Sequence, residues 1–194
     1  MDIEDIQKHY ERMSNSQFIL LLTTNAHGLR PEVFSIIEKE IEKRNLDPNL
    51  LKGALAQNKE YSLEEIEVYS KLLQDLPCPI CKETREKLNG TISHTVISFI
   101  VFTSSRAEPI IACPNCLDKK NKRSMISTFL LGWWGFPFGI LKTPIYIYRN
   151  YKAKKENHIS VPNNTLLSYT LENIGQIETH RNDKKMLQHI IKPQ

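Results

Sequence analysis

The stretch Cys78-Pro79-Ile80-Cys81, followed after 31 residues by Cys113-Pro114-Asn115-Cys116, decides how this chain folds. These two CxxC motifs contain all four cysteines of the sequence. In a reducing compartment, paired CxxC motifs are typical of a metal site rather than of disulfides. Zinc binds four thiolates in a tetrahedron, and each CxxC turn presents two of them. The sequence therefore predicts a structural Zn²⁺ site with the ligands Cys78, Cys81, Cys113 and Cys116.

The residues between the two motifs predict a β-hairpin. Thr91–Thr103 is rich in β-branched and aromatic residues and follows the turn sequence Asn89-Gly90, so it is predicted as a first strand. Ser104–Ala107 is predicted as the connecting loop and Glu108–Ala112 as the returning strand. Two CPxC motifs joined by such strands resemble a zinc ribbon. The resemblance implies a metal-stabilised module that binds nucleic acid, binds protein or only holds a fold together.

A thiol oxidoreductase is the other chemistry that a CxxC motif allows. It requires a thiol whose pKa is lowered, usually by a helix N-terminus, and the βαβ pattern that surrounds such motifs is missing here. Four protein ligands would also close a zinc site and leave no position for a reacting water. We therefore expect no catalytic residue, and the chain is predicted not to be an enzyme.

Charge is distributed unevenly along the 194 residues. Residues 1–77 carry 9 basic and 14 acidic side chains, whereas residues 78–194 carry 17 basic and 8 acidic ones. The second part is therefore expected to meet an anionic surface, although two solvated faces of opposite sign would give the same composition. The acidic start, Met1–Asp5, lacks the apolar core of a secretory signal, so we expect a cytoplasmic location.

Residues 1–77 predict a small bundle of short helices. Apolar residues recur there at helical spacing. Ser14 with Gln17 and Ser62 with Glu65 have the spacing of capping boxes, which mark two helix starts. No set of catalytic residues is recognisable in this bundle. Core formation explains most of its apolar residues, and a docking surface for a protein partner is the functional alternative.

The segment Met125–Tyr148 is 24 residues long and has Lys142 as its only charge. As one straight helix it would measure about 36 Å, enough to cross a bilayer core of about 30 Å. Glycine and proline interrupt its middle, however, in the sequence GWWGFPFG at 132–139, and Pro144 is expected to interrupt it again. Tryptophan, which favours the membrane–water interface, lies at this break. The sequence therefore predicts a helix–break–helix hairpin.

Basic residues flank this segment on both sides. Because basic flanks favour the cytoplasmic side of a membrane, both ends of the hairpin are expected on that side. The hairpin would then enter one leaflet or lie in the interface, with its flanks against anionic lipid. A hairpin packed as soluble core and a full membrane span are the alternatives. The predicted membrane contacts are Trp133, Trp134, Phe136, Phe138, Lys122, Arg123, Arg149 and Lys152.

The GWWGFPFG run, followed by Leu141–Pro144 and by Arg149-Asn150, resembles a segment of uncharacterised bacterial membrane-associated proteins. In those proteins the segment also follows a CxxC pair. The resemblance spans roughly residues 75–150. It implies a zinc-binding, membrane-associated protein of unassigned activity and transfers no catalytic residue.

Together these features predict an α+β fold in four parts. The parts are a helical bundle (1–77), a zinc-ribbon module (78–118), a basic-flanked apolar hairpin (119–155) and a C-terminal helical tail (156–194). The leading functional hypothesis is a non-enzymatic, zinc-binding, membrane-associated adaptor or scaffold. The alternative is a nucleic-acid-binding zinc ribbon, which is weakened because the aromatic residues do not alternate with Lys and Arg. A CxxC thiol oxidoreductase is the second alternative.

Overall fold

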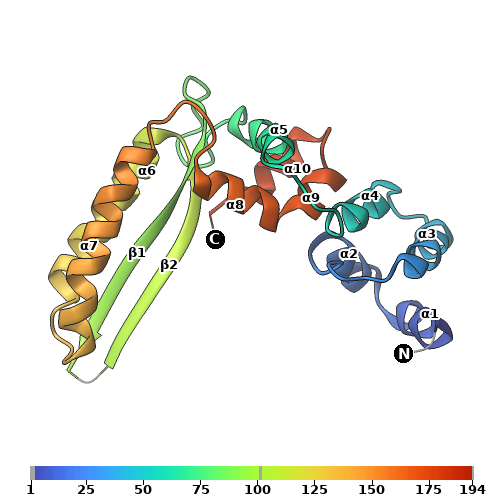
Figure 1. Cartoon of the computed structure of the whole chain (residues 1–194), viewed down its shortest axis with the longest axis horizontal. Helices are drawn as coiled ribbons and strands as arrows, with labels where there is room; N and C mark the ends of the chain where they lie inside the picture. The colour runs from blue at the N-terminus through green and yellow to red at the C-terminus, as the bar shows by residue number, and fades with distance from the viewer. Residues whose placement is uncertain (1–2, 101, 194) are drawn as a thin grey trace. The chain divides into compact units, whose positions relative to one another are not determined.

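The computed structural model describes residues 3–100 and 102–193 and has the helix-rich α+β character that the sequence predicts (Figure 1). Val101, which falls within the predicted first strand, lies outside the described residues, as do Met1, Asp2 and Gln194. The chain divides into two compact units. Unit 1 comprises Met1–Tyr69 and Thr170–Ile190, and unit 2 comprises Ser70–Tyr169 and Ile191–Gln194. The predicted C-terminal tail is shared between the two units.

Unit 1 consists of short helices, as the sequence predicts. Ser14 and Gln17 form the capping box at the start of α2: Gln17 N donates to Ser14 Oγ (3.3 Å), and Ser14 N donates to Gln17 Oε1 (3.0 Å). The core of the unit contains Tyr10, Phe18 and Ile37. Its elements are α1 (Ile3–Arg12), α2 (Asn15–Thr24), η1 (Pro31–Val33), α3 (Phe34–Lys43), α4 (Asn49–Ala56), α9 (Ile174–Thr179) and α10 (Lys184–Ile190). The boundaries between the units fall within α5 (Leu63–Gln74) and α8 (Asn164–Glu172).

Unit 2 is built on a long two-stranded antiparallel sheet. β1 (Asn89–Phe99) pairs with β2 (Phe102–Ala112) from Asn89 opposite Ala112 to Phe99 opposite Phe102. The predicted loop at Ser104–Ala107 is wrong, because these residues belong to β2. They are polar because β2 is an exposed edge strand, where hydrophilic side chains face water and discourage pairing with other chains.

The two helices that follow the sheet form the predicted hairpin. α6 (Pro114–Leu131) and α7 (Phe138–Glu156) are separated by a break at 132–137. The second interruption predicted at Pro144 is wrong, because Pro144 lies inside α7. A proline in a helix loses one backbone hydrogen bond, and the packing of α7 along α6 and β1 maintains the helix around it.

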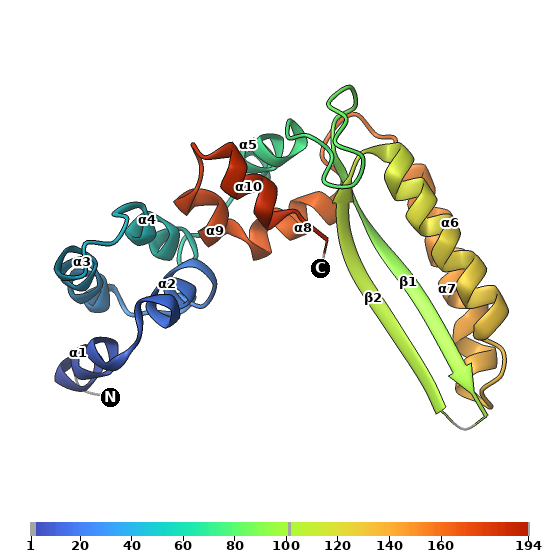
Figure 2. The same cartoon turned by 180° about the vertical axis from the view of Figure 1, so that it is seen from behind.

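Both helices lie beside β1, on the side away from β2 (Figures 1 and 2). The Asn150 side chain of α7 bonds the backbone of His94 twice: its Oδ1 accepts from His94 N (2.9 Å), and its Nδ2 donates to His94 O (2.6 Å). Thr128 Oγ1 of α6 accepts from Val96 N (3.1 Å). At His94 and Val96 the free edge of β1 is therefore satisfied by helix side chains instead of by a third strand.

The two turns of unit 2 meet at one end of the sheet (Figures 1 and 2). Phe136 N, in the break between the helices, donates to Ile100 O at the end of β1 (3.1 Å). Gly135 pairs with Ile100 as an isolated bridge. A Cβ at Gly135 would lie 2.5 Å from Thr103 Oγ1 and 2.8 Å from Ser98 Cβ, so only glycine permits this close approach.

We predict that Asn150→Ala destabilises unit 2 by about 2–4 kcal/mol, because a buried N–H and a buried C=O of His94 both lose their partner. Chemical denaturation and hydrogen exchange of the His94 amide measure the effect. Lys152→Ala, at an exposed position of the same helix, is the control and should change stability by less than about 0.5 kcal/mol. Equal effects of the two substitutions would contradict the edge-satisfying role of Asn150.

Candidate metal centre and apolar tip

The first CxxC motif lies in the loop between α5 and β1. Cys78 N donates to Glu83 O (2.9 Å), and Lys82 N donates to Cys78 O (2.9 Å), which closes the loop into a tight turn. Lys82 has a φ of 66°, the left-handed conformation that such a turn requires after its last cysteine. This turn directs both sulfurs of the motif to the same side.

The second CxxC motif begins a helix. Cys113 is the N-cap residue of α6 in extended conformation, and Pro114 takes the first helical position, where its missing N–H costs nothing. Cys116 follows in the first turn. The motifs are joined by β1 and β2 as predicted, but the helix at the second motif was not predicted. Its signal in the sequence is Pro114, because proline at the first position is typical of a helix start.

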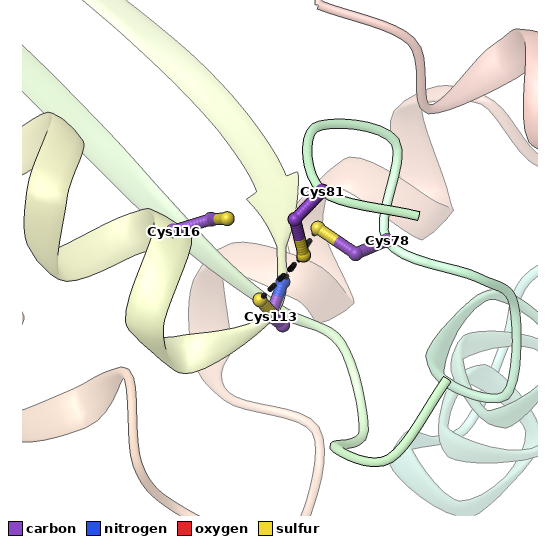
Figure 3. Close-up of side chains that lie close together, drawn as sticks. All are labelled: Cys78, Cys81, Cys113 and Cys116. Atoms are coloured by element: carbon purple, nitrogen blue, oxygen red, sulfur yellow. Dashed lines mark hydrogen bonds between the residues drawn. The ribbon is translucent and has the colours of Figure 1, made fainter. Parts of the chain in front are cut away.

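The four cysteines converge from these two places (Figure 3). Their sulfur atoms all lie within 4.8 Å of one another, and Cys81 Sγ lies 3.6 Å from Cys113 Sγ. Four thiolates about 2.3 Å from one zinc ion would be about 3.8 Å apart. The predicted ligand set is therefore brought together at metal-binding distance. Cys78, Cys113 and Cys116 are buried, and only Cys81 is exposed.

The surroundings of the sulfurs favour a thiolate at Cys78. Burial raises the pKa of this thiol, but backbone N–H groups of Cys113, Cys81 and Ile80 outweigh burial and lower the pKa to about 7. Burial raises the pKa of Cys113 to about 11 and also raises the pKa of Cys116. A lowered pKa at Cys78 suits a metal ligand and would equally suit a reactive thiol, so these pKa directions do not separate the metal site from the thiol oxidoreductase alternative.

A set of exposed apolar residues lies at the end of unit 2 where the two turns meet. Trp134 and Phe136, both predicted as membrane contacts, have 70% and 78% of their surface exposed. Trp133 and Phe138 are exposed as well. We call this region the apolar tip. Its members are Phe99, Ile100, Phe102, Phe129, Leu130, Leu131, Trp133, Trp134, Phe136 and Phe138.

Three members of the apolar tip come from the sheet and were not predicted. Phe99, Ile100 and Phe102 are all exposed at the end of the β-hairpin. They were missed because the turn was predicted at 104–107, which placed them inside a strand. On β1, the apolar residues Ile97 and Phe99 alternate with Ser98 and are both exposed. This alternation is the signal that could have indicated an uncovered strand end.

Apart from Leu117 near the start of α6, the buried residues of α6 and α7 are small or polar. Thr128, Thr143 and Asn150 are fully buried. A Cβ at Gly132 would lie 2.2 Å from Thr143 Oγ1, and one at Gly139 would lie 2.5 Å from Gly132 O, so small residues allow the two helices to approach closely. The helical hairpin therefore buries hydroxyls, amides and glycines while it exposes aromatic and aliphatic side chains.

The predicted basic contacts lie on the same two helices, further from the apolar tip. Lys122 and Arg123 of α6 and Arg149 and Lys152 of α7 are all exposed. Lys142 is the one charge close to the tip, and its Nζ donates to Ser105 Oγ on β2 (3.3 Å). Among residues 3–100 and 102–193, no helix is both long enough and apolar enough to cross a membrane.

We predict that the purified chain binds one zinc ion and that Cys113→Ser lowers its zinc affinity about 100-fold, because one of four ligands is lost. Cys113 makes no side-chain cap bond and serine is a favourable residue at this position, so the start of α6 is not weakened and the loss reports on the metal. Metal analysis and competition with a chelator measure the affinity, and Ser168→Ala on α8 serves as the control. All four thiols should resist alkylation until zinc is removed. A thiol that reacts in the zinc-loaded protein would contradict a closed four-cysteine site.

Comparison of the chain with protein-family models, with curated proteins and with solved structures gives no match. The functional interpretation therefore follows from the four-cysteine cluster, the apolar tip and the basic residues themselves.

Proposed function

We propose that this protein is a non-enzymatic, zinc-stabilised adaptor or scaffold that attaches to a membrane by inserting its apolar tip into one leaflet. The observation that carries the proposal is the reversed polarity of the helical hairpin. In a water-soluble hairpin the aromatic and aliphatic residues face inward. In lipid, small residues pack between helices and large apolar side chains face outward. α6 and α7 follow the second pattern, with Thr128, Gly132 and Thr143 inside and Phe129, Trp134 and Phe138 outside.

The spacing between the apolar tip and the basic residues fits one leaflet. Arg123 precedes the end of α6 by eight residues, and Arg149 follows the start of α7 by eleven. At 1.5 Å per residue, these charges lie about 12 Å and 16 Å along the helices from the tip. Half of a bilayer core is about 15 Å thick. With the tip inserted, both guanidinium groups would therefore reach the lipid headgroups, where basic side chains are favourable.

Hydrogen bonds within the apolar tip support insertion. Lipid offers no hydrogen bonds, so an inserted turn must satisfy its own polar groups. Phe136 N already donates to Ile100 O, and Trp134 Nε1 donates to Leu130 O (2.9 Å). Lys142 bonds Ser105, and its long side chain can extend toward the headgroups. These contacts lower the cost of moving the tip out of water.

Charge separation between the units supports an adaptor. Unit 1 carries 11 basic and 16 acidic residues, and unit 2 carries 15 and 6. An anionic membrane would attract unit 2 and repel unit 1, so the helices of unit 1 would stay available to a protein partner. Free cysteines and basic residues beside the inserted segment are both typical of the cytoplasmic face, which is the location that we propose.

The distribution of aromatic residues favours lipid over nucleic acid. A surface that binds single strands alternates aromatic rings with cations. In the apolar tip the rings of Trp134, Phe136 and Phe138 are instead grouped together, and Lys142 is the one charge within Met125–Tyr148. Nucleic acid remains the alternative partner of the basic unit 2, and its signature would be binding that weakens steeply with salt.

We predict that the zinc-loaded chain floats with vesicles of phosphatidylcholine and phosphatidylglycerol, and that Trp134→Ser with Phe136→Ser lowers this partitioning at least about tenfold through lost apolar contact. Both tryptophans of the chain, Trp133 and Trp134, belong to the apolar tip. The fluorescence of the unsubstituted protein therefore reports on the tip alone and should shift to the blue on vesicle addition.

The control is Leu63→Ser with Val161→Ser. These residues are 62% and 60% exposed, similar to the tip residues, but lie outside the apolar tip. The control should float like the unsubstituted protein. An unchanged tryptophan emission together with a tip-dependent dimer in sedimentation would contradict the proposal, because the tip would then cover a second copy instead of lipid.

A further inference from the structure

A polar groove of about 480 Å³ lies between α6 and one face of the sheet, above the apolar tip. Its walls come from three elements: β1, β2 and α6. Five of its ten lining residues carry hydroxyl groups, and Ser93 Oγ lies 2.6 Å from Ser124 Oγ across the junction of β1 and α6. The lining residues are Ser93, Thr95, Ile97, Ser104, Arg106, Glu108, Lys120, Arg123, Ser124 and Ser127.

Three cations and one carboxylate face this groove. Arg106 lies on β2, and Lys120 and Arg123 lie one turn apart on α6. Among the described residues, none of these three cations forms an ion pair within 4.0 Å, and Glu108 forms none either. The groove thus combines a net positive charge with several hydroxyl donors, and both are groups that bind phosphate oxygens.

The distance of the groove from the apolar tip matches the depth of the phosphate layer of a membrane. Arg106 is four residues from the β2 end of the sheet turn, which corresponds to about 14 Å along the strand. Lys120 and Arg123 lie about 16 Å and 12 Å from the end of α6. All three cations therefore stand close to half of a bilayer core, about 15 Å, above the tip.

We propose that this groove binds the phosphate of an anionic lipid headgroup while the apolar tip is inserted. Arg106 and Arg123 hold the phosphate oxygens from opposite walls, Lys120 adds a third charge, and Ser124 and Thr95 donate hydroxyl hydrogen bonds. The inference rests on the proposed function, because the depth argument requires an inserted tip. It adds that attachment depends on which headgroup is present and not only on apolar contact.

The test uses flotation of the full zinc-loaded chain with vesicles of phosphatidylcholine alone and of phosphatidylcholine with phosphatidic acid. Arg106→Gln with Arg123→Gln should weaken binding to the phosphatidic acid vesicles about tenfold more than binding to phosphatidylcholine. Arg85→Gln with Lys87→Gln removes the same charge at two exposed positions outside both the groove and the predicted membrane contacts, and should weaken binding by no more than about threefold. This difference between the two variants would support the groove.

Other outcomes separate the inference from the proposed function. Equal losses in both double variants, or equal binding of the unsubstituted protein to both vesicles, would overturn the groove while the membrane attachment stands. Binding to neither vesicle would overturn the proposed function and, with it, the assignment of the bound phosphate to a lipid headgroup. A second experiment adds glycerol 3-phosphate without vesicles and follows the amide NMR resonances of Thr95 and Ser124. If these resonances shift, and if flotation does not depend on the groove residues, the groove would be assigned to a free phosphate compound instead of a lipid.

Discussion

The free edge of β1 is the constraint on which the rest of unit 2 depends. A two-stranded sheet leaves one row of backbone groups unpaired on each strand, and an isolated pair is at best marginally stable in water. Asn150 and Thr128 close the row on β1 with side-chain hydrogen bonds. To reach that edge they must lie on the inner faces of α7 and α6. The inner faces of the two helices are therefore occupied mainly by polar and small residues, and most of their large apolar residues point outward.

The metal centre and the apolar tip are the two ends of this arrangement. At one end the cysteines join the loop before β1 to the first turn of α6, so a bound zinc ion would fix where the helix leaves the sheet. Nearby, Asn89 Nδ2 donates to Ile159 O (2.9 Å) and Val161 O (3.0 Å), which attaches the chain after α7 to the start of β1. At the other end, the bond from Phe136 to Ile100 holds the two turns together. A module fixed at its base can present an apolar tip without a covering layer.

Apolar and basic surfaces are separated along the same module. Apolar side chains occupy the tip, and the cations Arg106, Lys120 and Arg123 begin about half a bilayer core away from it. A water-soluble core would separate these two surfaces less strictly, because an interface between water and lipid sorts residues by depth. The membrane attachment that we propose would account for both the exposed aromatic residues and the position of the charges.

The sequence by itself determined the two CxxC motifs, the α+β character, the capping box of α2 and the break at 132–137, because each of these follows from residues close together in the chain. Cys78 and Cys81 are spaced for one turn, and glycine and proline end a helix wherever they cluster. Only the tertiary structure decided that Ser104–Ala107 is strand, that Pro144 stays helical and that Phe99, Ile100 and Phe102 join the apolar tip. These features depend on which backbone edge is covered and which turn meets which. The contact from Phe136 N to Ile100 O, for example, joins residues 36 positions apart in the sequence.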